Sequence, residues 1–448
     1  MPVCRRVRLW AVLLGLVLWP AGIGPVAAQT ADSGWDRDDR AIAERFAPVF
    51  HQGMVGTRFD FITNFDFDGD WVGDNNWLDS ADPKYPQKGY VYYAVSETAT
   101  HYFVHYAAFH PRDYKGGELT GEILSQAVRR GAQASARVLD PSIANDAVLA
   151  HENDLEGCLV VAEKRGSSLA EARIVFVETL AHNRYLKFQL EPTLTGDVGT
   201  FRTEGEQPLI YVEPKGHGME AYDDQLTRRE ATPDGDAAAG RAVGTSGSAS
   251  SGGRTLAQRV NGMVESFNKY RKAVNLEGAE QIRIYRYTGT ADDPEQGTGD
   301  IGYDLLPLYE TIWARARRGP NETFGEMSDY GSREVSAADA PGAKKSVRLG
   351  SLGSSFRGVA GAENKARPPW GWFDMTERGR PLGEWFFDPA AVINRHFPTA
   401  TIATAYVHQP FLGVIRQGRK AGKAGEAGKA GEGKAASTGY SLPALPAF

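Results

Sequence analysis

Cysteine is nearly absent from this chain of 448 residues, which has only Cys4 and Cys158. We expect Cys4 to be removed with an N-terminal signal, so the mature chain has one cysteine and forms no intrachain disulfide. An exported chain without disulfides needs an adequate hydrophobic core, a bound metal, or both. Because 42% of the residues are hydrophobic, such a core can form.

Long apolar runs and a strong charge of either sign are also lacking. After the N-terminal stretch, no segment approaches the ~20 apolar residues that span a bilayer. The net charge of -6 is mild and shows no nucleic-acid signature. We therefore expect no transmembrane span and no nucleic-acid partner, while peripheral membrane contact stays open.

Several catalytic motifs are missing as well. The sequence contains no Gly-x-Ser-x-Gly elbow, phosphate-binding loop or His-Glu-x-x-His zinc motif. Whether the protein is an enzyme stays open, and no catalytic residue is assigned.

The N-terminus has the pattern of a secretory signal peptide. Three arginines within residues 5–8 precede the apolar run 9–18, and residues 26–28 (Val-Ala-Ala) have cleavage-site spacing. We expect cleavage after Ala28 and export to the periplasm or the extracellular space.

Patterns typical of β-strands dominate the rest of the chain. They occur at 59–61, 65–67, 90–95, 102–109, 158–162, 174–180, 209–212, 282–287 and 401–407. Because they do not alternate regularly with helices, we predict a mainly β fold with an antiparallel, β-sandwich-like core. Peripheral helices are predicted at 121–139, 256–274 and 304–317.

The predicted organisation is a signal peptide (1–28), a single β-rich domain (29–416) and a low-complexity Gly/Ala/Lys tail (417–448). Two insertions interrupt the domain: a helix at about 115–150 and a disordered loop at about 231–253, which has almost no apolar bulk.

The segment 151–161, HENDLEGCLVV, concentrates metal-binding side chains before an apolar run. If a strand begins near Asp154, alternation directs Asp154 and Glu156 to one face and Leu155 to the other, with His151 in the preceding turn. Carboxylates with an imidazole suit a hard divalent cation, Ca²⁺, Mg²⁺ or Mn²⁺. The alternative is a solvated acidic turn.

A second candidate ligand lies upstream. The strand that carries His101 and His105 ends at Pro111, so Asp113 projects just past its end. Asp113 is either a ligand or an ordinary turn aspartate beside Arg112.

Taken together, Pro111-Arg112-Asp113 and the heptapeptide 150–156 resemble the core of the necrosis- and ethylene-inducing-like proteins, a family of secreted cytolysins. Their hallmark is Gly-His-Arg-His-Asp-Trp-Glu, preceded by an aromatic strand that ends in Pro-Lys-Asp. The resemblance implies a divalent cation bound by four ligands, which are Asp113, His151, Asp154 and Glu156.

Two further segments extend the resemblance. The segment 215–218 (KGHG) is similar to a His-Gly of the same family, which implies that His217 lines the pocket. The segment 46–51 (FAPVFH) and the His-x-x-Asp-x-Glu pattern are similar to a vacuolar-sorting-like family. Glu152, Asn153 and Leu155 depart from the cytolysin motif, so metal binding is better supported than cell lysis.

Other segments supply further candidates for residues that line the pocket. In 64–75 (NFDFDGDWVGDN), calcium-loop spacing fails at Asn75, where glutamate is expected, and we interpret the segment as an acidic rim that places Asp68 at the pocket. His105 faces either the core or the cavity, and Glu152 is a further pocket candidate. The aromatic segments 368–374 and 383–390 either fill the core or form a platform for a sugar or lipid headgroup.

These observations favour an exported divalent-metal-binding protein that recognises a sugar or phosphate-bearing headgroup, as on a glycan or glycolipid. Two alternatives remain open. One is a metal-dependent hydrolase of phosphoester or glycan bonds in which His217 or Glu152 moves protons. The other is a structural envelope protein that a metal stabilises.

Overall fold

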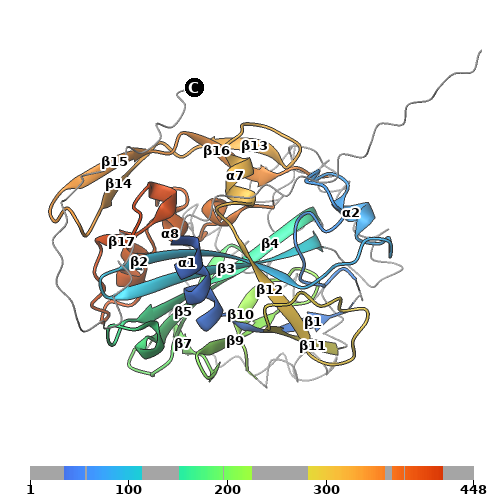
Figure 1. Cartoon of the computed structure of the whole chain (residues 1–448), viewed down its shortest axis with the longest axis horizontal. Coiled ribbons are helices and arrows are strands. Elements are labelled where there is room, and N and C mark those ends of the chain that lie inside the picture. Colours follow the sequence, from blue (N-terminus) through green and yellow to red (C-terminus); the bar gives the residue numbers. More distant parts are fainter. Residues whose placement is uncertain are drawn as a thin grey trace, which may run out of the picture.

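A large curled sheet forms the centre of the molecule (Figure 1). The computed structural model describes residues 35–55, 58–113, 151–194, 196–223, 281–358, 366–377 and 379–416. The expected signal peptide, inserted helix, disordered loop and tail lie outside these ranges, as do the helices predicted at 121–139 and 256–274.

The large sheet has 13 strands in the order β10-β9-β1-β11-β12-β2-β3-β4-β5-β6-β7, with β17 beside β2 and β8 beside β9. Its strands are β1 (Val49–Met54), β2 (Tyr90–Thr98), β3 (His101–Asp113), β4 (His151–Glu163), β5 (Arg173–Ala181), β6 (Arg184–Gln189), β7 (Val198–Thr200), β8 (Thr203–Glu204), β9 (Gln207–Val212), β10 (Met219–Ala221), β11 (Gln281–Tyr287), β12 (Ile301–Pro307) and β17 (Tyr406–His408).

Two small sheets and several short helices complete the described residues. The small sheets pair β13 (Phe324–Asp329) with β16 (Ser351–Phe356), and β14 (Ser332–Ser336) with β15 (Lys344–Arg348). The helices are α1 (Trp35–Arg45), α2 (Asn76–Asp79), α7 (Ile312–Ala316), α8 (Glu384–Phe387) and α9 (Pro389–His396), with 3₁₀ turns η1 (Leu169–Glu171), η2 (Pro369–Gly371) and η3 (Pro410–Leu412). Among the described helices, none is long and apolar enough to cross a membrane.

The predicted mainly β fold is confirmed, and the sheet is mixed rather than purely antiparallel. Strands β2 to β6 follow one another as antiparallel neighbours. Parallel pairs, by contrast, join β1 to β9, β11 to β12, β12 to β2 and β6 to β7. Parallel neighbours need a connection that crosses over, and the β1–β9 and β12–β2 pairs join strands that are far apart in the sequence.

Alternation along β3 and β4 divides the core between the two faces of the sheet. Phe103 and Leu159 belong to one buried cluster, whereas Tyr106 and Cys158 belong to the other. Because both faces are covered, these strands have almost continuous apolar sequences. Helix α1 contacts β2, β3 and β12 (Figure 1).

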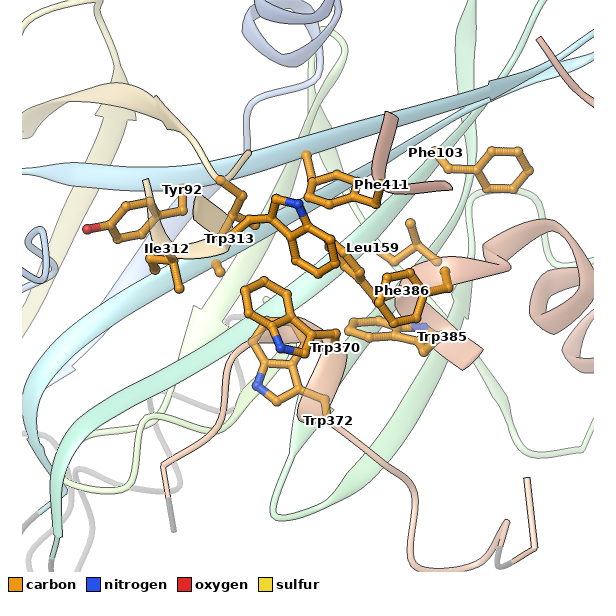
Figure 2. Packing of buried hydrophobic residues seen from close by; sticks show 14 of the residues in the cluster. Tyr92, Phe103, Leu159, Ile312, Trp313, Trp370, Trp372, Trp385, Phe386 and Phe411 are labelled. Carbon is orange, nitrogen blue, oxygen red and sulfur yellow. The ribbon is translucent and has the colours of Figure 1, made fainter. Parts of the chain in front are cut away.

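Aromatic side chains from the C-terminal part of the chain cover the Phe103 face. The ring centroids of Trp313 and Trp370 lie 5.0 Å apart in an edge-to-face contact, and Phe386 packs beside Trp370 (Figure 2). Trp370 and Trp385 are almost completely buried. The aromatic segments 368–374 and 383–390 therefore serve mainly as core, as one of the two interpretations expected.

Four predicted elements were wrong in type or extent: the helix 304–317 and the strands 59–61, 65–67 and 401–407. The helix expected at 304–317 is limited to α7, because its first residues belong to β12. Residues 59–67 form turns with one isolated bridge between Thr63 and Phe109, since the Asp60 carboxylate accepts backbone N–H groups of Val55 and Lys215 in place of a strand partner. The run 401–407 is mostly irregular, with only β17 at its end.

Candidate functional site

The antiparallel register of β3 and β4 determines where the predicted ligands lie. Asp113 is paired with His151, and His110 is paired with Asp154. Strand β4 begins at His151, three residues earlier than expected, so His151 lies on the strand and not in a preceding turn. The expected alternation is confirmed, since Leu155 joins the Phe103 cluster while Asp154 lies on the opposite face.

Asp113 and His151 form a close pair at the ends of their strands. The distance from His151 Nε2 to Asp113 Oδ2 is 3.8 Å, and the side chains are only 20% and 11% exposed, respectively. His151 Nδ1 lies 3.0 Å from the carbonyl oxygen of Glu152. A carbonyl only accepts, so Nδ1 carries a proton, and the ring directs Nε2 toward the carboxylate.

Asp154 belongs to a buried polar cluster around His217. Asp154 Oδ2 lies 2.8 Å from His217 Nδ1, and Asp60 Oδ1 lies 3.4 Å from His217 Nε2. The His217 ring stacks on His110 with a centroid separation of 3.7 Å, and His110 Nε2 contacts Gln52 Oε1 at 3.0 Å. His217 is completely buried, so this cluster lies inside the fold.

The two stacked imidazoles have opposite protonation preferences. Burial alone would lower the pKa of His217, but hydrogen bonds and attraction from Asp154 and Asp60 raise it to about 9. Burial, with repulsion from His217, lowers the pKa of His110 well below its ordinary value. The expected link between His217 and the 151–156 motif is therefore an ion pair with Asp154.

The register separates Glu156 from Asp113. Glu156 pairs with Ala108, five residues before Asp113 on β3, which corresponds to ~17 Å at ~3.4 Å per residue. In this conformation one ion does not reach both carboxylates. Among the described residues, no three His, Cys, Asp or Glu side chains gather closely enough to hold a metal ion.

Two of the three altered motif positions, Glu152 and Asn153, hold α2 against the sheet. Glu152 accepts the backbone N–H of Trp77 at 2.8 Å, and its cross-strand neighbour Arg112 donates to the carbonyl of Trp77. Asn153, at a φ of 61°, accepts from the Asn76 amide at 2.6 Å. Glu152, expected in the pocket, thus has a structural partner, and sequence reasoning did not predict this role because the partner is 75 residues away.

The remaining pocket candidates are His105 and Asp68, and His105 lies eight residues before Asp113 on β3. His105 is buried on the opposite face from His110, with Nε2 3.1 Å from the carbonyl of Trp385. Asp68 lies in the turn before α2, where burial and then repulsion from Asp70 and interaction with Asp79 outweigh a backbone hydrogen bond and raise its pKa to about 7.

A second ionic cluster escaped the sequence-based predictions. Glu178 on β5 contacts His396 Nδ1 and accepts from Trp385 Nε1 at 2.7 Å. His396 Nε2 lies 2.6 Å from Glu377, whose other oxygen accepts from Arg395 at 2.9 Å. The available signal was Glu178 itself, a carboxylate within the apolar strand IVFVETL.

Comparison with known proteins gives a partial structural similarity. No family model matches the chain, and no curated protein matches it. The non-toxic HaNLP3 protein has 17% identity over 41% of this chain and 69% of its own, with a TM-score of 0.24. Necrosis and Ethylene inducing Protein 2, from the causal agent of cocoa's Witches Broom disease, has 14% identity over 41% and 68%, with a TM-score of 0.23.

NLPPya in complex with mannosamine has 16% identity over 41% of this chain and 67% of its own, with a TM-score of 0.24. These proteins carry the name of the family that the motifs resemble. At such identities and TM-scores, the similarity assigns neither family membership nor activity to this chain. The similarity to the vacuolar-sorting-like family stays a prediction.

Proposed function

We propose that this chain binds a divalent cation where β3 ends and β4 begins, and that the cation recognises a sugar or phosphate-bearing headgroup. The observation that carries the proposal is the facing pair of Asp113 and His151, whose Oδ2 and Nε2 atoms lie 3.8 Å apart. The proposal rests on the chemistry and surroundings of these two side chains.

The pair has the features of a cation site. A separation of 3.8 Å is too long for a hydrogen bond but fits one ion bonded to both atoms at ~2.0 to 2.5 Å. The contact of His151 Nδ1 with the Glu152 carbonyl is the backing that metal-bound histidines usually have, since it orients the ring and its lone pair. The Asp113 carboxylate suits Ca²⁺, Mg²⁺ and Mn²⁺, for which an imidazole is a less usual ligand than an oxygen atom.

Asp154 and Glu156 are not ligands of the cation in this proposal. Asp154 positions the end of β4 through its ion pair with His217, and Glu156 lies too far along the strand to share an ion with Asp113. Two protein ligands leave several positions of a hard cation open for oxygen atoms. Hydroxyl and phosphate oxygens of a headgroup match those positions.

Calorimetric titration tests the proposal. Chelator-treated protein is titrated separately with Ca²⁺, Mg²⁺ and Mn²⁺, beside Asp113→Ala, His151→Gln and the exposed control Asp197→Ala. We expect Asp113→Ala and His151→Gln to lose at least about tenfold in affinity, since each removes one ligand, while the control keeps the affinity. Undiminished affinity of both variants for all three ions would reject the site.

The residues that a hydrolase would use for proton transfer have structural partners. His217 is completely buried between Asp154 and Asp60, and Glu152 is bonded to Trp77. We therefore propose recognition and not turnover. Incubation with phosphodiester and glycoside substrates, with and without EDTA, checks this choice, because metal-dependent product release would replace it with the hydrolase.

A further inference from the structure

A cavity of about 220 Å³ opens between β6 and the segment 372–395. Tyr185, Trp372, Phe373 and Trp385 contribute its aromatic wall. Trp372 packs on Gly157 and donates to the carbonyl of Leu155 at 3.0 Å, which places the cavity on the Phe103 face of the sheet. Gly157 lies six residues after His151 on β4, which corresponds to ~20 Å at ~3.4 Å per residue, so this cavity is separate from the Asp113–His151 site.

The polar wall of the cavity is held in place by ion pairs. Arg395 donates to both Glu377 and Glu384 at 2.9 Å. Glu377 is also bonded to His396 at 2.6 Å. These contacts fix the carboxylates before any ligand arrives, and a preorganised polar wall reduces the entropy lost on binding.

The chemistry of the lining selects the ligand. Small-molecule sites combine apolar and aromatic walls with a few fixed polar groups, and this cavity adds exposed Arg380 at its rim. Carboxylates accept hydrogen bonds from hydroxyl groups, guanidinium groups donate to them, and an aromatic wall packs against the C–H face of a sugar ring.

Size and charge narrow the choice further. A volume of about 220 Å³ lies below the ~300 to 1,000 Å³ of typical small-molecule pockets, which suits one sugar ring and not a longer segment. The lining contains three carboxylates, of Asp374, Glu377 and Glu384, and two guanidinium groups, of Arg380 and Arg395. The excess of negative charge disfavours an acidic ligand.

We propose that this cavity binds a single saccharide ring, neutral or amine-bearing, without a metal ion. The aromatic wall takes the apolar face of the ring, while Glu384 and Arg380 bond its hydroxyl groups. This second sugar site is independent of the cation at Asp113 and His151, so either proposal can fail alone.

Saturation-transfer NMR and affinity titrations, both in EDTA, test the cavity with methyl glucoside, methyl glucosaminide and methyl glucuronide. We expect saturable binding of the first or second probe and at least fivefold weaker binding of the glucuronide. Arg380→Ala and Phe373→Ala should each weaken binding at least about fivefold. The exposed control Arg348→Ala and the cation-site variant Asp113→Ala should leave binding unchanged.

Three results would overturn the inference. The first is the absence of saturable binding for every probe. The second is unchanged affinity in both Arg380→Ala and Phe373→Ala. The third is loss of binding in Asp113→Ala with retention in Arg380→Ala, which would place the sugar at the cation site. Circular dichroism and thermal melting confirm that each variant is folded before its affinity is compared.

Discussion

Four histidines on or beside β3 and β4 differ in chemical state because their neighbours differ. His217 lies between two carboxylates and favours the charged form, whereas its stacked neighbour His110 favours the neutral form. His151 presents Nε2 to Asp113, and His105 is buried against a backbone carbonyl. The motif predicted Asp113 and His151 as metal ligands. The surroundings of each imidazole ring depend on residues distant in the sequence, which a local pattern does not reveal.

His105 gives a pH-dependent prediction. Burial lowers its pKa from 6.5 to about 3, despite the opposing bond to the Trp385 carbonyl. The unfolded chain therefore binds a proton below about pH 6.5 that the folded chain does not, and His105 reduces the stability progressively as the pH falls from that value toward 3. At about pH 4.5 the cost is about 2 to 3 kcal/mol, at ~1.4 kcal/mol per unit.

His105→Gln keeps an N–H donor but does not titrate. Denaturant unfolding at about pH 7.5 and about pH 4.5 should show that this variant loses about 2 kcal/mol less than the parent chain between the two conditions. Equal losses in both proteins would show that His105 is not held neutral by burial. His101, whose pKa burial also lowers, to about 4, remains in both proteins.

At the scale of elements, β3 and β4 were predictable and their ends were not. The aromatic and β-branched residues of 102–109 and 158–162 indicated both strands correctly. The start of β4 was placed at Asp154 because 151–153 is polar. The strand includes these residues because Glu152 and Asn153 find buried partners in and around α2, which no local pattern reveals.

Gly157 tests the packing of β4. A β-carbon at this position would collide with the ring of Trp372 and with the Tyr106 carbonyl. We expect Gly157→Ala to destabilise the fold by about 1 to 3 kcal/mol in denaturant unfolding, as overpacking does. Gly297→Ala is the matched control, because nothing lies within 4 Å of its added methyl group. A Gly157→Ala variant as stable as this control would contradict the described packing.

At the scale of the whole molecule, the strand patterns along the sequence indicated a mainly β chain, but the order of the strands could not be inferred. β12 lies beside β2, and β1 joins β9 and β11; these pairs bring together residues more than 150 positions apart in the sequence. Hydrophobic periodicity indicates a strand and its buried face, but it does not show which strand pairs with it. The aromatic cavity arises in the same way, because Tyr185 and the segment 372–395 meet only after folding.

At the scale of the whole molecule, we also predict that the chain is exported after cleavage of its N-terminal segment. If the N-terminal pattern is a signal peptide, secreted protein from an expression host should begin at Gln29, which mass spectrometry of the intact chain and its N-terminal peptide measures. A chain that keeps residues 1–28 and stays with the cells would contradict the predicted location.

The central claim is a divalent cation held between Asp113 and His151. Its most direct test is an anomalous difference map from a crystal of the chain grown with Mn²⁺. We expect a manganese peak within ~2.0 to 2.5 Å of both Asp113 Oδ2 and His151 Nε2. A well-ordered Asp113–His151 pair without such a peak, or manganese bound only at other residues, would contradict it.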